Sequence, residues 1–147
     1  MKKILIVDDQ PDIRRLINLA LGRRYEITEA NDGTGALTQI SANRPDAIIL
    51  DVMMPGGIDG IDVLKHVKND KQLHDDEDVA QLLVVLDVAQ LHVKNDKQLR
   101  DVFVVMVTAK GQAGDLESAM RAGADGYLIK PFSPLQLMAL LQEHFGS

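Results

Sequence analysis

The chain has 147 residues, 46% hydrophobic and 26% charged, so it is long enough for one domain with a buried core and too apolar for wholesale disorder. A net charge of −6 argues against a nucleic-acid partner, because no cluster of Lys and Arg is available to contact phosphates. The absence of cysteine excludes disulfides, thiolate catalysis and zinc-thiolate sites. The first apolar run, Ile4–Val7, is too short for export or membrane spanning, so we expect a cytoplasmic protein with no membrane partner.

Short apolar runs alternate with helical patterns along the chain. Several runs are nearly continuous in β-branched and other apolar residues, which is typical of strands buried on both faces of a sheet. Five strands are expected, at about 3–7, 25–30, 47–50, 102–107 and 127–129. Helices are expected at about 11–21, 33–41, 60–69 and 134–144. This alternation predicts an α/β fold, with a five-stranded parallel sheet covered by helices on both faces.

One octapeptide breaks this rhythm. The sequence HVKNDKQL at 66–73 recurs letter for letter at 92–99, a shift of 26 residues, which indicates a duplication, natural or engineered. Removing one 26-residue unit from the 147 residues leaves 121 and restores an even alternation of strands and helices. We therefore expect a single domain over 1–147 with an inserted segment at about 74–99, equivalently 66–91, between the third helix and the fourth strand. His66 and His92 of the repeat are expected at the surface.

The interior of the insert carries two competing patterns. Residues 76–95 predict a helix, with Asp76 as its cap, an acidic first turn and an apolar stripe too wide for a solvated helix. The helix is favoured, and a strand is the alternative, because LLVVLDV at 82–88 echoes IILDV at 48–52. The helical pattern leaves apolar surface that needs a partner, and either copy of the octapeptide can complete the third helix. A homodimer or segment-swapped oligomer through the insert is therefore expected as an option.

Polar side chains follow the predicted strands at the points where they end. Asp8 and Asp9 follow the first strand, and Asp51 follows the third. Thr108 follows the fourth and Lys130 the fifth. In parallel α/β sheets, ligands bind outside the carboxyl ends of the strands, so these groups should converge. Three carboxylates favour a hard cation such as Mg²⁺, while the hydroxyl and the ammonium suit a phosphoryl group that one carboxylate accepts as nucleophile.

Four stretches of the chain resemble the receiver domains of response regulators, in particular single-domain, CheY-like ones. These stretches are ILIVDDQPDIRRLI, PDAIILDVMMPGGIDGIDVL, VVMVTAKG and AGADGYLIKPFSP, which together cover essentially the whole chain except the repeated insert. The resemblance implies a flavodoxin-like, doubly wound sheet in the order 2-1-3-4-5. The 22 residues from Thr108 to Lys130 suit the family, whereas the 57 from Asp51 to Thr108 exceed its spacing by about one repeat unit.

The resemblance also implies roles for individual residues. Asp51 would be the phosphoacceptor of a two-component phosphorelay, which assists its own phosphorylation and dephosphorylation and is not an enzyme in the usual sense. The ligands of Mg²⁺ would be Asp8, Asp9, Asp51 and the backbone carbonyl of Met53. Lys130 and Thr108 would bind the phosphoryl oxygens. Thr108 and Tyr127 would form the switch pair that reorganises on phosphorylation.

The partners that the resemblance implies are a sensor histidine kinase or phosphotransfer protein and a downstream protein. The downstream protein would bind the fourth helix, the fifth strand and the fifth helix, at about 112–145. Because the sequence ends at Ser147, just after the last helix, we expect no output domain. A Mg²⁺-dependent phosphatase of the haloacid dehalogenase type is disfavoured, since that class needs an Asp where Met53 stands. The remaining alternative is a duplicated or engineered assembly scaffold, in which the insert drives association and the site is merely inherited.

Overall fold

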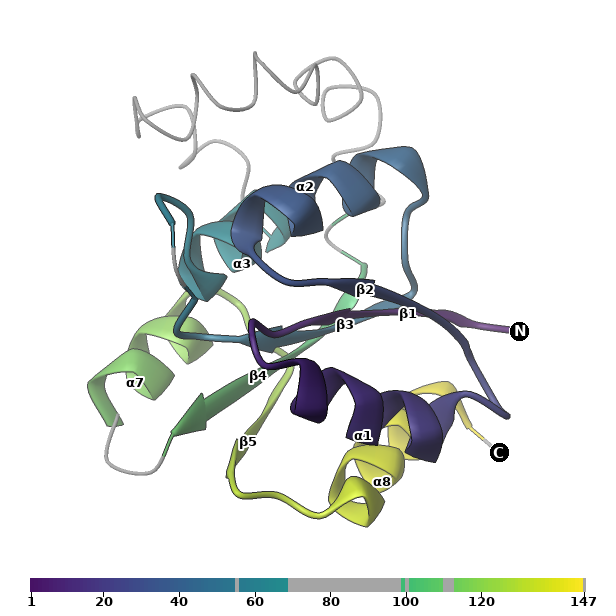
Figure 1. Ribbon diagram of the computed structural model, residues 1–147. Helices are drawn as coiled ribbons and strands as arrows, with labels where there is room; N and C mark the ends of the chain where they lie inside the picture. The colour runs from purple at the N-terminus through teal and green to yellow at the C-terminus, as the bar shows by residue number, and fades with distance from the viewer. Residues whose placement is uncertain (55, 69–98, 100, 110–112, 147) are drawn as a thin grey trace.

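The structure is a parallel five-stranded sheet with helices on both faces (Figure 1). It is a computed structural model that describes residues 1–54, 56–68, 99, 101–109 and 113–146. The strands are β1 (Lys3–Val7), β2 (Glu26–Ala30), β3 (Ala47–Asp51), β4 (Phe103–Ala109) and β5 (Gly126–Lys130). The helices are α1 (Pro11–Leu21), α2 (Gly33–Ala42), α3 (Gly60–Lys68), α7 (Ala113–Arg121) and α8 (Pro134–Phe145). The order β2-β1-β3-β4-β5 confirms the predicted flavodoxin-like sheet.

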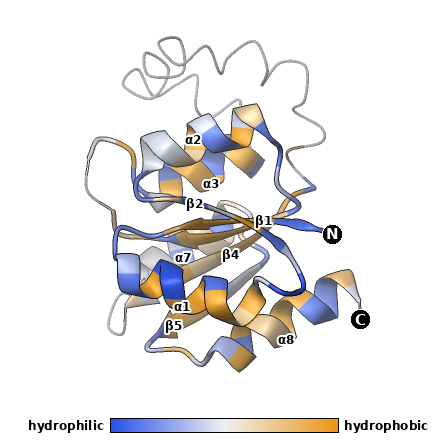
Figure 2. Ribbon diagram, turned by 45° about the vertical axis from the view of Figure 1, so that its right-hand side comes forward, coloured by the Kyte–Doolittle hydropathy of each residue, from blue (hydrophilic) through white to orange (hydrophobic). Residues whose placement is uncertain are grey.

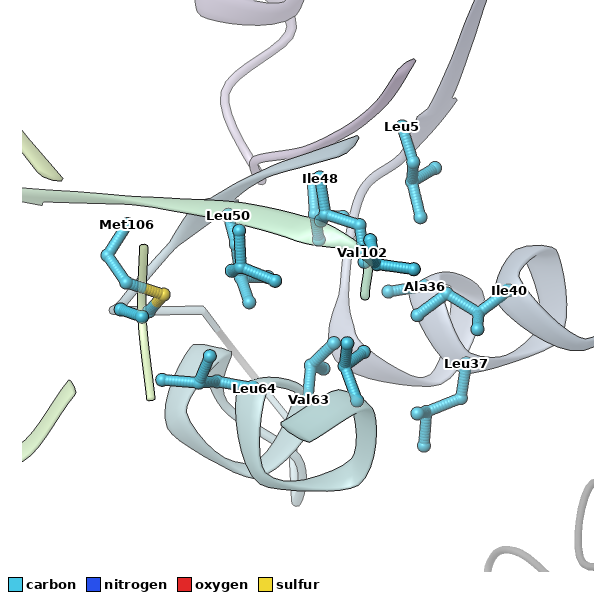
Figure 3. Close-up of a cluster of buried hydrophobic side chains, with 14 of the residues drawn as sticks. Leu5, Ala36, Leu37, Ile40, Ile48, Leu50, Val63, Leu64, Val102 and Met106 are labelled. Carbon is cyan, nitrogen blue, oxygen red and sulfur yellow. The ribbon is translucent and has the colours of Figure 1, made fainter. Parts of the chain in front are cut away.

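The sheet separates two hydrophobic cores. Helices α2 and α3 lie on one face and α1 and α8 on the other (Figure 1). Alternate residues of the strands point to opposite faces, so Leu50 packs with α2 and α3 while Ile49 packs with α1 and α8. Figure 3 shows Val63 and Leu64 of α3 directed at the side chains of the central strands. Burial on both faces explains why β1 and β3 are almost wholly apolar, and Figure 2 shows the centre of the sheet in orange.

The register of the strands aligns their carboxyl ends at one edge of the sheet. Val7 of β1 lies beside Leu50 of β3, so the residues that follow them are also neighbours. β4 is two residues longer than predicted at its carboxyl end, so Thr108 lies inside the strand and not after it. Ala109 at the end of β4 pairs with Lys130 at the end of β5.

The chain leaves α3 and returns to the sheet at the amino end of β4, opposite to the carboxyl ends of the strands. Lys68, the last residue of α3, donates a hydrogen bond from Nζ to the carbonyl oxygen of Val102, just before β4, at 2.6 Å. Leu99 is buried in the core, and its carbonyl oxygen accepts from the N–H of Val102 at 3.1 Å. The helix or strand predicted at 76–95, and the predicted insert at 74–99 apart from Leu99, lie outside the described residues.

Two histidines differ from what the sequence indicates. His66 was expected at the surface, and this is wrong, because only 1% of its surface is exposed. It lies one turn after Val63 on α3, and Val63 belongs to the core. His144, for which the sequence shows no partner, stacks on Phe103 at the start of β4, with 4.1 Å between the ring centroids. His92 lies outside the described residues.

Candidate functional site

Three carboxylates meet at the carboxyl ends of β1 and β3. Asp8 and Asp9 follow β1, Asp51 ends β3, and one oxygen from each lies within 4.8 Å of the others. Asp8 and Asp51 are buried, whereas Asp9 is exposed. The parallel register of β1 and β3 causes this convergence, because neighbouring strands that end together place their next residues side by side.

Lys130 is the cation that faces these carboxylates. Its Nζ lies 3.1 Å from Oδ2 of Asp8 and 3.3 Å from Oδ2 of Asp51. Burial by itself lowers the pKa of Lys130, but the hydrogen bond to Asp8 and the charges of Asp51 and Asp8 outweigh it and raise the pKa above its ordinary value. The ammonium is therefore charged throughout the physiological range.

Asp51 lies in an environment that disfavours its own charge. Burial and the negative charge of Asp8 raise the pKa of Asp51 from 3.8 to about 6, against the opposing effect of Lys130. The N–H of Met53 donates to Oδ1 of Asp51 at 3.3 Å, so one carboxylate oxygen is held by backbone and the other by the lysine. One ammonium thus leaves the negative charge of this cluster incompletely neutralised.

The cluster suits a hard divalent cation. Carboxylate oxygens at this separation are ligands that Mg²⁺ prefers, and two positive charges would relieve the repulsion between Asp8 and Asp51. The site also has room for a phosphoryl group, because a hollow of about 320 Å³ opens beside it. The residues that line this hollow are Asp9, Gln10, Asp51, Met53, Ala109 and Lys130.

The predicted switch pair lies on neighbouring strands. Thr108 of β4 is buried, next to Val107, which pairs with Asp51 of β3. Tyr127 of β5 pairs with Met106, two residues before Thr108, so Tyr127 and Thr108 belong to the same face of the sheet. Tyr127 is 46% exposed, and its ring is accessible to solvent. The structure thus brings Thr108 and Lys130 to the edge occupied by Asp51 and leaves Tyr127 at the surface.

Two residues of the site were not singled out from the sequence. Gly60 begins α3 directly against the end of β3, where an added Cβ would lie only 2.1 Å from the carbonyl oxygen of Asp51. Any side chain there would push α3 away from the end of β3. Gln10 donates from its backbone N–H to Oδ1 of Asp8 at 2.9 Å, and its side-chain oxygen lies 3.5 Å from Nζ of Lys130. The sequence signal for Gln10 is its place directly after the two aspartates, in the segment DDQP.

The fold and this cluster together define a flavodoxin-like α/β protein with an acidic site at the carboxyl edge of its sheet. A family model for the response regulator receiver domain matches residues 4–84, more than half of the chain. The chain therefore belongs to the family of response regulator receiver domains. The expectation of such a domain, which the sequence motifs gave, is confirmed, and receiver domains bind Mg²⁺ at an acidic pocket like the one formed by Asp8, Asp9 and Asp51.

Individual relatives agree with this assignment. The phosphate regulon transcriptional regulatory protein PhoB of Escherichia coli is 32% identical over 142 residues, 96% of this chain and 50% of PhoB. The DNA-binding response regulator MtrA of Mycolicibacterium smegmatis is 31% identical over 139 residues, 94% of this chain and 48% of MtrA. The structure of the chemotaxis protein CheY4 of Vibrio cholerae is 28% identical with a TM-score of 0.71, covering 97% of this chain and 98% of CheY4.

The chain spans about half the length of the curated relatives that it matches. What those proteins regulate or bind through their remaining residues is a property of the relatives, and the absence of a nucleic-acid partner stays a prediction for this chain. Among the described residues, no helix has both the length and the apolar character needed to cross a membrane.

Proposed function

We propose that Asp51 accepts a phosphoryl group in a two-component phosphorelay. The observation that carries this proposal is the placement of a buried carboxylate that shares the ammonium of Lys130 with Asp8, beside a hollow open to solvent. The donor is the phosphohistidine of a sensor kinase or phosphotransfer protein, or a small acyl phosphate. An oxygen of Asp51 forms the new bond to phosphorus as the bond from phosphorus to the donor breaks, and the donor leaves with the electron pair.

Each surrounding group has a defined task in this transfer. Lys130 binds one phosphoryl oxygen, which it can reach because its Nζ already lies 3.3 Å from Oδ2 of Asp51. The hydroxyl of Thr108 donates to a second oxygen after the phosphoryl group is in place. Mg²⁺, held by Asp8, Asp9, Asp51 and the backbone carbonyl of Met53, would neutralise charge on the remaining oxygens. Hydrolysis of the acyl phosphate later resets the site.

The transfer depends on the ionisation of Asp51. A nucleophilic carboxylate must be ionised, and its pKa of about 6 leaves it only partly ionised in mildly acidic solution. Lys130 already opposes this rise of the pKa, and a divalent cation would act in the same direction. The geometry therefore favours transfer at neutral pH in the presence of Mg²⁺.

The signal would reach a protein partner through α7, β5 and α8. Thr108 and Tyr127 lie on the same face of neighbouring strands, so a shift of Thr108 toward the phosphoryl group makes space that Tyr127 can fill. Tyr127 and Ile129 are 46% and 45% exposed, which leaves an apolar stripe on the edge strand β5. This stripe is the part of the predicted 112–145 surface whose shape the phosphorylation state would change.

Intact mass spectrometry after incubation with acetyl phosphate and Mg²⁺ tests the proposal. We expect one labile phosphoryl adduct per chain, absent without Mg²⁺ and absent in Asp51→Asn, which keeps the size of the side chain and removes the nucleophile. A folded wild-type protein that acquires no adduct contradicts the proposed function. Asp46→Asn, which changes a carboxylate at the opposite edge of the sheet, is the control and should label as the wild type does.

A further inference from the structure

Both oxygens of the Asp8 carboxylate are engaged in this structure. Oδ1 accepts from the backbone N–H of Gln10 at 2.9 Å, and Oδ2 faces Nζ of Lys130 at 3.1 Å. Within the described residues, three side chains offer oxygen acceptors to that ammonium: Asp8, Asp51 and, at 3.5 Å, the amide oxygen of Gln10. Gln10 is the uncharged member of this set and the most distant from Lys130.

Gln10 occupies a position in α1, the N-cap, that is unusual for a glutamine. It is the N-cap of α1, with extended backbone angles of φ −92° and ψ 113°, yet its side chain makes no capping hydrogen bond. Asp32 and Ser133 hold the same position in α2 and α8, and both side chains cap their helices. Ser, Thr, Asp and Asn are the residues that stabilise an N-cap, because their short side chains reach the free N–H groups. The side chain of Gln10 instead extends over the hollow beside Asp51.

This arrangement matters when Asp51 is phosphorylated. A divalent cation on Asp8 repels the ammonium of Lys130 from Oδ2 of Asp8, since both are positive. Lys130 must nevertheless stay near Asp51 to bind the phosphoryl oxygen. A neutral acceptor beside the hollow can hold the ammonium there without trapping it. A further carboxylate at the same place would trap it.

We propose that Gln10 is a positioning residue: its amide oxygen keeps the ammonium of Lys130 over the hollow when Asp8 is taken by the cation. This inference rests on the proposed function of Asp51 and adds to it a residue that acts through Lys130. The backbone N–H of Gln10 holds Asp8 whatever the side chain is, so substitution of the side chain tests the contact to Lys130 alone.

The test uses Gln10→Ser in the full chain. Serine can cap α1, so the melting temperature should stay level or rise by about 1–5 °C. The rate constant for phosphorylation by acetyl phosphate with Mg²⁺ should fall about threefold to tenfold, as expected for the loss of one modest hydrogen bond. The dissociation constant of Mg²⁺ for the unphosphorylated protein, measured by calorimetry, should stay within about twofold, because the backbone contact to Asp8 remains. A positioning role thus moves stability and rate in different directions.

A double-mutant cycle with Lys130→Ala identifies the route of the effect. In the Lys130→Ala background, Gln10→Ser should change the rate little, because the group that Gln10 positions is gone. Gln142→Ala, at a glutamine of α8, is the control and should leave the rate unchanged. An unchanged rate in Gln10→Ser, an equal loss in both backgrounds, or a Mg²⁺ affinity weakened severalfold overturns this inference while the wild type still labels. A wild type that takes no label overturns the proposed function itself, and the inference with it.

Discussion

Asp51 is buried beside another carboxylate, so the folded protein holds its negative charge against two unfavourable effects. Loss of hydration and the charge of Asp8 both raise its pKa, and the single ammonium of Lys130 does not reverse the shift. In the unfolded chain the same carboxyl ionises near its ordinary value of 3.8. Between pH 3.8 and about 6, the folded protein therefore keeps a proton that the unfolded chain has released. Stability falls with rising pH across this window and stays lower above it.

The first prediction follows from this sign. Without Mg²⁺ at pH 7, Asp51→Asn should be more stable than the wild type by about 2–3 kcal/mol, the free energy that corresponds to a shift of about two pKa units. The difference should be much smaller at pH 4, where Asp51 is protonated in the folded protein and about half protonated in the unfolded chain. Urea unfolding followed by circular dichroism at pH 4 and pH 7 measures it. Addition of Mg²⁺ should also reduce the gap, because the cation stabilises only the wild-type cluster.

A control separates this effect from the general loss of a carboxylate. Asp12→Asn removes an exposed acidic side chain in the first turn of α1, and its effect should stay within about 0.5 kcal/mol at both pH values. An Asp51→Asn protein that is no more stable than the wild type at pH 7 would show that Lys130 already balances the buried charge.

At the residue scale, much of the carboxylate cluster was predictable from the sequence. Asp8, Asp9 and Asp51 were placed together because the carboxyl ends of parallel strands share one edge, and the structure brings the three within 4.8 Å. Gln10 and Gly60 were missed, because their importance depends on distances to Lys130 and to the backbone of Asp51 that no sequence pattern encodes.

At the scale of elements, the two copies of the octapeptide differ in what precedes them. In α3, Val63 and Leu64 come before the first copy, and both are fully buried. Ala89 and Gln90 stand at the matching positions before the second copy. An alanine would leave a cavity, and a glutamine would bury an amide in an apolar core, each at a cost of about 2 kcal/mol or more. These neighbours explain why the first copy supplies the end of α3.

The residues that follow the copies decide the other boundary. The second copy ends at Leu99, and Val102 three residues later is fully buried just before β4. The position that matches Val102 after the first copy is Asp76, which could not occupy that apolar environment. The sequence alone left open which copy completes the fold. Comparison with the buried positions indicates that the first copy is joined to α3 and the second to β4.

The second prediction tests this division with one substitution in two places. Lys68 pairs with Oδ2 of Asp125 at 2.8 Å and donates to the carbonyl oxygen of Val102, while its side chain is mostly buried. Lys68→Ala should therefore lower the free energy of unfolding by about 1–3 kcal/mol, because the carbonyl of Val102 loses this donor and the partly buried carboxylate of Asp125 loses its cation, keeping the N–H of Val104. Lys94→Ala changes the identical residue of the second copy and should have an effect within about 0.5 kcal/mol.

Thermal unfolding of the two variants, followed by circular dichroism, makes the comparison. Equal losses would mean that both copies support the fold equally. A loss in Lys94→Ala alone would reverse the assignment of the copies.

At the scale of the whole molecule, the alternation of strands and helices was sufficient to predict the layers and, with the family resemblance, the order of the sheet. Parallel strands leave little freedom, because each crossover must carry a helix to one face. The strand endings were less certain: β4 includes Thr108 and Ala109, which hydrophobicity alone could not show. The interpretation of 76–95 as helix or strand stays a prediction, since it lies outside the described residues.

The last prediction concerns the repeat unit as a whole. Removal of 69–94 produces the same 121-residue sequence as removal of 66–91 or 74–99, because the two octapeptides are identical. The cut rejoins Lys68 to the residues before Leu99 at the amino edge of β4, on the opposite side of the sheet from Asp51. We therefore expect this shortened protein to fold and to take a phosphoryl group on Asp51, as proposed for the full chain. By loop closure alone, shortening the connection from 30 to four residues should stabilise the fold by up to about 2 kcal/mol.

Light scattering over a concentration series distinguishes a domain with an insert from an assembly scaffold. If the insert drives association, the full chain should form dimers or larger species as concentration rises, and the shortened protein should remain a monomer. A full chain that is monomeric at every concentration would contradict the scaffold alternative. It would support a receiver domain that tolerates a duplication. A shortened protein that fails to fold would mean instead that 69–94 is an integral part of this domain, because the 121 remaining residues would then lack contacts that the full chain needs.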